Sequence, residues 1–318
     1  MARRPAPNVV DSRSESRPTD ATRRLVASLL VSLRPHQWTK NLIIFAALIF
    51  GRRLGDPAAV VRSIEAFVVF CALSGVVYLI NDVVDREADR LHPVKARRPI
   101  AVGDVTAGPA IGVALALAAG AVAAAFALGS TFGLVSAGYL MLLGFYSGPL
   151  KRLVLVDVMT IAMGFVLRAM AGAVVVEVPI SHWLLVLTVM LALFIGFSKR
   201  RHELVSLAGD AADHRENLGR YSAPLLDQLI AVTAAGTLIA YAIYTISPET
   251  IEKFGSGQLG LTLPFPAYGI FRYLYLVYQE DGGGSPAEAL VTDRPLLLCV
   301  GLWGLAVITI IYAGPLPL

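Results

Sequence analysis

The sequence predicts an all-α polytopic membrane protein, a bundle of about nine transmembrane helices. Three observations support this prediction. The 318 residues are 56% hydrophobic and only 16% charged, whereas a soluble domain carries about 25% charged residues. Apolar runs long enough to span a bilayer recur along the whole chain, which indicates one membrane domain and not two domains. Most Lys and Arg residues lie in alternate loops, on one side of the expected membrane.

The N-terminal segment differs from the rest in composition. Residues 1–22 are rich in Arg, Pro, Ser and Asp and lack the apolar core of a signal peptide, so we expect a disordered cytoplasmic tail. Residues 23–318 are expected to form a single transmembrane domain that begins with a short interfacial helix over 24–34.

The membrane spans are expected wherever about 20 mainly apolar residues follow one another. The nine expected spans are 36–52, 58–80, 105–127, 129–146, 153–176, 181–198, 224–246, 259–278 and 294–314. Small residues crowd the third span, and such residues let membrane helices approach closely. Short turns around Gly129 and Pro179 join spans on one side.

The basic residues predict the orientation of the bundle. Of the 27 Lys and Arg residues, 21 lie in the N-terminal tail and in alternate loops. The positive-inside rule places these segments in the cytoplasm, so we expect an inner (plasma) membrane protein with its N-terminus inside. This bias also explains the net charge of +4 without a nucleic-acid partner. The inner loops are the longer and more polar ones, so the active site is expected on the cytoplasmic side.

The strongest chemical signal directly follows the second span. Asn81, Asp85 and Asp89 are four residues apart, and Asp82 precedes Asp85 by three. Side chains at these spacings share one face of a helix, which is expected to continue from the span. Clustered carboxylates suit magnesium, which binds a few of them together with substrate phosphates. The motif predicts a Mg²⁺–diphosphate site held by the three aspartates. A solvated helix end is the competing interpretation.

Basic side chains in the inner loops are candidates for phosphate contacts. An Arg guanidinium binds phosphate through two parallel hydrogen bonds, although the same residues are also typical positive-inside or headgroup-anchoring residues. The polar side chains that we expect to bind substrate near the inner face are Lys40, Asn41, Asn81, Arg98, Tyr146, Lys151, Lys199 and Arg200.

Arg168 stands in the middle of the fifth span, where a charge costs at least about 3 kcal/mol. It is therefore expected to face the interior of the bundle. Asp157 precedes it by eleven residues, about three helical turns, so both side chains are expected on one helix face. A polar substrate cavity is the favoured interpretation, and a structural ion pair is the alternative.

These motifs resemble a known family. Asn81 to Asp89, followed by Pro99-Ile100-Ala101 and Gly103, resembles the first aspartate-rich motif of the UbiA superfamily of intramembrane prenyltransferases. The nine expected helices, and a second motif after the fourth span that ends at Asp157, also match. Four segments resemble one branch, the decaprenyl-phosphate phosphoribosyltransferases. These segments are 34–41, 165–172, 198–204 and 292–295.

The resemblance implies a Mg²⁺-dependent transferase. It would move the 5-phosphoribosyl group of 5-phosphoribosyl 1-diphosphate to a polyprenyl (decaprenyl) phosphate, with release of diphosphate, for the synthesis of cell-envelope arabinose donors. Residues 23–318 would then be the catalytic domain, and Asp82, Asp85 and Asp89 would be its catalytic, metal-binding residues. The sequence leaves open whether the chain forms a homo-oligomer.

Two alternatives stay open at this point. An aromatic prenyltransferase of the same superfamily would use the same metal site. Many superfamily members carry two acidic residues four apart in the second motif, whereas here Ile161 follows Asp157 at that spacing, which disfavours a prenyl diphosphate donor. A membrane transporter is the alternative of another class, and the lack of an inverted repeat of broken helices in the sequence argues against it.

Overall fold

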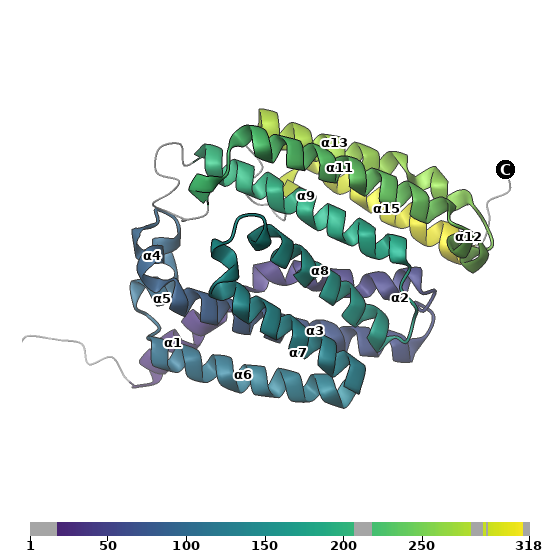
Figure 1. The fold of residues 1–318 in the computed structure, drawn as a ribbon. Coiled ribbons are helices and arrows are strands. Elements are labelled where there is room, and N and C mark those ends of the chain that lie inside the picture. The colour runs from purple at the N-terminus through teal and green to yellow at the C-terminus, as the bar shows by residue number, and fades with distance from the viewer. Residues whose placement is uncertain (1–17, 207–217, 281–288, 291, 314–318) are drawn as a thin grey trace, which may run out of the picture.

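A computed structural model of the chain describes residues 18–206, 218–280, 289–290 and 292–313. The regular elements in these residues are all helices. Figure 1 shows the long helices side by side with roughly parallel axes, while short helices gather at the two ends. The predicted all-α membrane bundle is therefore confirmed.

Seven helices within the described ranges are long and apolar enough to cross a membrane. They are α3 (Pro57–Val84), α6 (Ala107–Leu128), α7 (Ser130–Ser147), α8 (Val156–Val175), α9 (His182–Ser206), α11 (Ala223–Ile246) and α15 (Arg294–Ala313). The shorter elements are α1 (Pro18–Ser32), η1 (Pro35–Phe45), α2 (Ala46–Phe50), α4 (Arg86–Leu91), η2 (Lys95–Arg97), α5 (Pro99–Val102), η3 (Leu150–Arg152), η4 (Leu218–Arg220), α12 (Pro248–Phe254), η5 (Gln258–Thr262) and α13 (Pro264–Gln279).

Two of the nine expected spans are not long regular α-helices. The first is the 3₁₀-helix η1 followed by α2, and the eighth is the 16-residue α13 preceded by η5. A 3₁₀-helix rises about 2.0 Å per residue against 1.5 Å for an α-helix. The 11 residues of η1 and the 5 of α2 therefore extend about 30 Å, which equals the thickness of the hydrocarbon core.

The N-terminal helix begins earlier than expected. α1 starts at Pro18 and not at residue 24, and residues 1–17 of the expected tail lie outside the described residues. Leu25, Leu29 and Leu33 pack against a cluster formed by α3, α5 and α6. Leu33 lies so close to α3 that a Cβ on Gly75 would be 2.7 Å from its Cδ2 atom. The contact holds α1 against the bundle.

α8 joins the two halves of the bundle. On one side Ala171 and Val175 belong to a core shared with η1, α3, α6 and α7. On the other side Val158 belongs to a core shared with α9, α11, α13 and α15. At Gly172 a Cβ would lie 2.2 Å from the backbone oxygen of Ile44. Only glycine therefore lets the backbone of η1 lie directly on α8.

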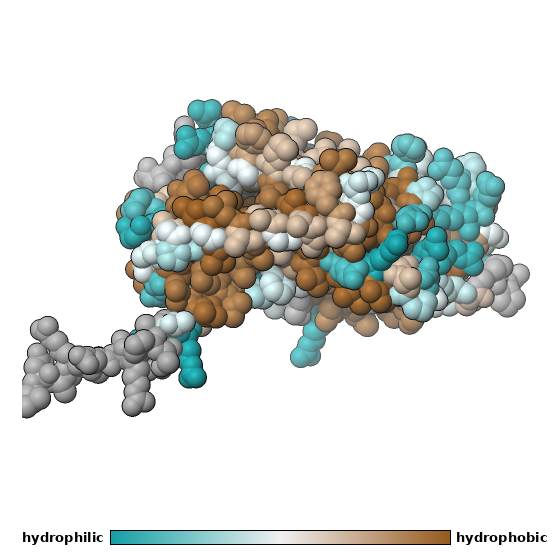
Figure 2. All heavy atoms as spheres, turned by 90° about the horizontal axis from the view of Figure 1, so that it is seen from below, coloured by the Kyte–Doolittle hydropathy of each residue, from teal (hydrophilic) through white to brown (hydrophobic). Residues whose placement is uncertain are grey.

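The surface shows how the bundle sits in a membrane. Large apolar side chains on the long helices are exposed, among them Leu115, Leu134 and Leu305. Figure 2 shows apolar side chains over the middle of one face and polar ones towards both ends. Exposed apolar surface of this extent marks a contact with lipid. Together with the seven apolar helices, it makes the chain a multi-pass membrane protein.

The two ends of the bundle differ. α4, α5, η2 and η3 gather at one end, called the charged end below, and α2 and α12 lie at the other, called the opposite end (Figure 1). The acidic motif and most of the expected site residues lie at or near the charged end.

Candidate active site

The acidic motif spans the junction of α3 and α4. Asn81 and Asp82 lie in the last turn of α3, Asp85 separates the two helices, and Asp89 lies on α4. The backbone N–H of Asp85 donates to the Asn81 oxygen and that of Asp89 to the Asp85 oxygen, both at 2.8 Å. The helix of the second span therefore continues as expected, with Asp85 as the one irregular residue between α3 and α4. This continuation keeps the three aspartates on neighbouring turns.

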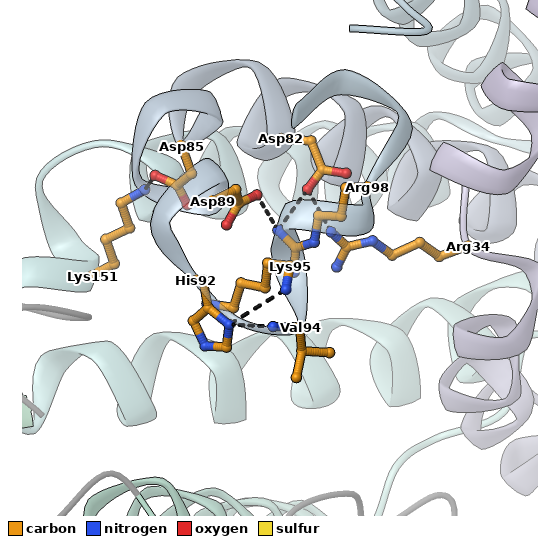
Figure 3. Close-up of polar contacts among 9 residues, drawn as sticks. All are labelled: Arg34, Asp82, Asp85, Asp89, His92, Val94, Lys95, Arg98 and Lys151. Atoms are coloured by element: carbon orange, nitrogen blue, oxygen red, sulfur yellow. Dashed lines mark hydrogen bonds and ion pairs between the residues drawn. The ribbon is translucent and has the colours of Figure 1, made fainter. Parts of the chain in front are cut away.

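Each aspartate of the motif is paired with a basic side chain (Figure 3). Arg98 Nη1 lies 3.0 Å from Asp82 Oδ1 and 2.5 Å from Asp89 Oδ2, so one guanidinium bridges two carboxylates. Arg34 also donates to Asp82. Figure 3 shows Asp85 turned the other way, towards Lys151, which donates to it.

Arg34 approaches the motif from the link between α1 and η1. Its φ of 54° is in the left-handed region, which costs about 1–3 kcal/mol for a residue other than glycine. The ion pair with the buried Asp82, and a position 4.9 Å from the centre of the Tyr78 ring, hold it there. Burial lowers the pKa of Arg34, and the charge of Asp82 opposes this effect. Sequence reasoning did not include Arg34 among the site residues.

The motif has carboxylate oxygens that could bind a hard cation, but basic side chains lie between these oxygens. Carboxylate oxygens are the ligands that magnesium prefers. Within the described residues no three His, Cys, Asp or Glu side chains lie close enough together to hold a metal ion. Arg98 occupies the space between Asp82 and Asp89. The residues fit a magnesium site in chemistry, provided that the guanidinium moves aside when the metal enters.

A second polar group surrounds Asp157 at the start of α8. Its side chain is fully buried and accepts a hydrogen bond from Arg200 Nε at 2.9 Å and another from the Tyr221 hydroxyl at 2.9 Å. Glu203 Oε2 accepts a further hydrogen bond from Arg200 Nη1 at 2.5 Å. Asp157 therefore does not pair with Arg168, and the alternative of a structural ion pair between these two residues is wrong. Asp157 and Arg200 hold α8 and α9 together, and Tyr146 lies near enough to act on the charge of Arg200.

Tyr221 secures this group from the segment before α11. Its hydroxyl accepts the backbone N–H of Leu155 at 2.7 Å while it donates to Asp157. Leu155 has a φ of 68°, so this hydrogen bond fixes a strained backbone at the start of α8. Burial raises the pKa of Tyr221 to about 12, and the hydroxyl keeps the proton that it donates.

A third polar group surrounds Arg168 inside the bundle. Arg168 Nε donates to Asn41 Oδ1 at 2.7 Å, and Nη2 donates to the Tyr139 hydroxyl at 2.6 Å and to Ser74 Oγ at 3.5 Å. The carbonyl of Gly164 accepts from Nη1 at 3.0 Å. Arg168 is 5% exposed, and within the described part of the chain none of its partners is a carboxylate.

This third group changes the interpretation of Asn41. The side chain is fully buried and serves as an acceptor for Arg168, so it positions that guanidinium. Sequence reasoning missed Ser74 and Tyr139, because a single polar residue in an apolar run carries no signal of its own. Arg168 was the only indication that such partners must exist.

Lys40 lies close enough to all three groups to be affected by their charges. The charges that act on its ammonium come from Arg34 in the first group, Lys199 beside the second and Arg168 in the third. Lys199 is half-exposed and lies 4.0 Å from Glu203. The tertiary structure thus brings Lys40, Lys199 and Arg168 into one electrostatic environment, although they are far apart in sequence.

Comparisons with known proteins show which family the chain belongs to. The model of the UbiA prenyltransferase family matches residues 41–291. Two curated relatives are named decaprenyl-phosphate phosphoribosyltransferase. The one from Mycolicibacterium smegmatis is 32% identical over 91% of this chain and 94% of its own, and the one from Mycobacterium tuberculosis is 33% identical over 91% and 96%.

A solved structure shares the fold. A UbiA homolog from Archaeoglobus fulgidus, bound to GPP and Mg²⁺, matches with a TM-score of 0.70 at 20% identity, over 89% of this chain and 99% of that one. The protein belongs to the UbiA prenyltransferase family, and within it to the branch of the decaprenyl-phosphate phosphoribosyltransferases.

Proposed function

We propose that the protein transfers the 5-phosphoribosyl group of 5-phosphoribosyl 1-diphosphate to a polyprenyl phosphate such as decaprenyl phosphate, and releases diphosphate. We place the reaction at the charged end of the bundle, on the cytoplasmic side of the plasma membrane, where the positive-inside rule puts the basic loops. The two relatives at 32% and 33% identity bear the name of this activity.

The observation that carries the proposal is the large number of basic groups around the acidic motif. Arg34, Arg98 and Lys151 all contact its aspartates. Arg86, within the motif, has a buried Nε atom without a hydrogen-bond partner among the described residues. A sugar donor with a diphosphate and a phosphate needs more cationic partners than the diphosphate of a prenyl donor, and Arg binds such groups through paired hydrogen bonds.

Magnesium fits the same site. Asp82 and Asp89 would hold the ion once Arg98 turns from them towards the phosphates, and Asp85 would assist from its position beside Lys151. The bound ion would neutralise the negative charge that develops on the departing diphosphate.

The protein residues then have to bind and orient two anions. Arg98 and Lys151 can exchange their carboxylate partners for phosphate oxygens, because both side chains are partly exposed, by 23% and 15%. The acceptor phosphate is anionic at neutral pH and attacks the anomeric carbon without a general base. Attack from the face opposite the leaving group inverts the configuration at that carbon.

The test is transfer of label from the ribosyl donor into lipid. The purified protein in detergent with Mg²⁺ receives labelled 5-phosphoribosyl 1-diphosphate and decaprenyl phosphate, and the lipid phase is counted. Asp85→Asn is expected to lower the rate about 10²-fold or more, as loss of a directly engaged charged group does. Glu87→Gln is the matched control, because this carboxylate is 78% exposed and contacts only Arg90 among the described residues.

The wild type and Glu87→Gln should transfer label, and Asp85→Asn should not. Prenylation of an aromatic acid from a prenyl diphosphate, without ribosyl transfer, would overturn the donor assignment and support the alternative within the family. Equal rates for Asp85→Asn and Glu87→Gln would overturn the placement of the reaction at this motif.

A further inference from the structure

The N-terminal helix α1 changes character along its length. Figure 1 shows it at the charged end, beside α5 and α6. Near its start Arg23 and Arg24 are exposed, whereas its last two turns carry no charge. The inner side of these turns packs on the bundle, and on the outer side Val26, Leu30 and Val31 are at least half exposed. A helix that is apolar on both sides needs apolar surroundings on its outer side as well.

The contact between α1 and α3 shows the depth at which α1 lies. α3 follows the exposed ion pair of Arg53 and Asp56 at the opposite end, which marks one boundary of the membrane. Gly75 comes 18 residues after Pro57, about 27 Å along the helix, and it lies against Leu33. The hydrocarbon core is about 30 Å thick. The C-terminal end of α1 therefore lies near the edge of this core at the charged end.

The charge of the N-terminal segment favours an anionic surface. Besides Arg23 and Arg24, the 17 residues before α1 contain four Arg and only two acidic residues. Basic segments next to a membrane are attracted by anionic lipid headgroups. Arg at headgroup level, followed by Val and Leu side chains at the edge of the acyl region, is the arrangement of an interfacial helix.

A protein partner fits the outer side of α1 less well. A stable protein–protein interface takes about 20–30 residues from each partner. The large apolar side chains on this side of α1 are Val26, Leu30 and Val31, which are too few to form the core of such an interface. Lipid needs no matching surface of this size, so the membrane itself is the favoured contact.

α1 leads directly into the candidate active site. The backbone N–H of Arg34 donates to the Val31 oxygen at 3.0 Å, and the Arg34 side chain pairs with Asp82. A displacement of α1 from the bundle would therefore move this guanidinium away from the acidic motif.

We propose that α1 attaches to the anionic lipid surface of the membrane, with Arg23 and Arg24 among the headgroups and Leu30 at the edge of the acyl region. This attachment holds Arg34 beside Asp82. Because the contact is with bulk lipid and not with a substrate, it stands or falls separately from the proposed function.

Hydrogen exchange tests the contact with anionic headgroups. The full chain is placed in nanodiscs of phosphatidylcholine alone or mixed with phosphatidylglycerol, and exchange of the amides of residues 25–34 is measured. Exchange should be about thirtyfold slower in the mixture, the factor that two Arg contribute at an anionic surface. Arg23→Gln/Arg24→Gln should remove this difference. α12, which carries two Glu and one Lys, is the internal control and should exchange equally in both lipids.

Fluorescence quenching tests the insertion of the apolar side. A fluorophore is attached to the cysteine of Leu30→Cys, and the wild type is the labelling control because Cys71 and Cys299 are buried. Bromine atoms on the lipid acyl chains should quench this fluorophore, and iodide in the water should not. In Glu87→Cys, at an exposed position of α4, the two quenchers should act in the reverse way.

Equal exchange in both lipids would overturn the role of the anionic headgroups. Quenching of the Leu30→Cys fluorophore by iodide would show that α1 faces water, and protection from both quenchers would indicate a protein partner; either result would overturn the insertion. Slower exchange that leaves out the Arg34 amide would overturn the link to the active site. The expected lipid contacts in a protein without ribosyl transfer would support the attachment and overturn the proposed function alone.

Discussion

Arg168 and Arg200 are both buried guanidinium groups, but they are balanced in different ways. Arg200, 3% exposed, lies between the carboxylates of Asp157 and Glu203 near the charged end. Arg168, 5% exposed, lies deeper on α8 and is surrounded by neutral acceptors. The first arrangement cancels the charge, and the second keeps a net positive charge inside the membrane domain.

The difference separates a structural role from a functional one. A buried ion pair loses much stability when one partner is removed, because the other charge stays buried and uncompensated. A buried cation without a counter-ion is itself unfavourable in a membrane domain. An anionic ligand would explain its retention there, so we propose that Arg168 contacts substrate and that Arg200 stabilises the fold.

Removing the Arg200 charge is expected to have the largest effect on stability. Arg200→Met leaves the fully buried Asp157 without its cation and should lower the free energy of unfolding by about 3–5 kcal/mol. Thermal unfolding in detergent measures the loss. The double variant Arg200→Met/Asp157→Asn should recover most of it, because no buried charge is then left alone. Equal stability of the single variant and the wild type would contradict the structural role.

A change at the contact between η1 and α8 should rank second. In Gly172→Ala the new Cβ would lie 2.2 Å from the Ile44 oxygen, so η1 must move away from α8 and carry Asn41 with it. We expect a loss of about 1–3 kcal/mol, as in other overpacked sites. Gly120→Ala is the control, because a Cβ there meets nothing within 4 Å. A larger loss in the control would show that the close contact is not the cause.

Removing the Arg168 charge should affect stability least and function most. In Arg168→Met the remaining groups are neutral, and the hydroxyls of Ser74 and Tyr139 still pair at 3.2 Å. The loss of a charge that costs at least about 3 kcal/mol inside a membrane offsets the lost hydrogen bonds. The unfolding temperature should stay near that of the wild type while the transfer rate falls. Destabilisation as large as in Arg200→Met would remove the contrast between the two residues.

A third arginine, Arg272, extends the comparison to a partly exposed ion pair. Arg272 pairs with Asp293 at 2.7 Å and is 23% exposed. The hydrogen bond from Arg272 lowers the pKa of Asp293, so the pair stabilises the fold above the ordinary pKa of an aspartate and loses this effect as the pH falls through the lowered pKa. Asp293→Asn, which can still cap α15, should show a smaller loss of thermal stability on acidification than the wild type. Parallel pH profiles would contradict this.

The sequence determined the membrane bundle, the approximate places of its apolar spans and the position of the acidic motif. Each of these depends on local patterns, namely runs of about 20 apolar residues and aspartates at helical spacing, which the chain shows without reference to its other parts. Membrane helices must also satisfy their backbone hydrogen bonds internally, so the fold class follows from composition and period.

Only the tertiary structure decided which charges meet. Helical spacing indicated that Asp157 and Arg168 share a face, yet Asp157 pairs with Arg200 and Arg168 with Asn41, 127 residues away. Nor did the sequence indicate that the first span is partly a 3₁₀-helix, in which Lys40 and Ile43 share a face. Spacing along one helix defines a face but not its neighbour, and the neighbour is selected by packing between helices, here by the close approach of η1 to Gly172.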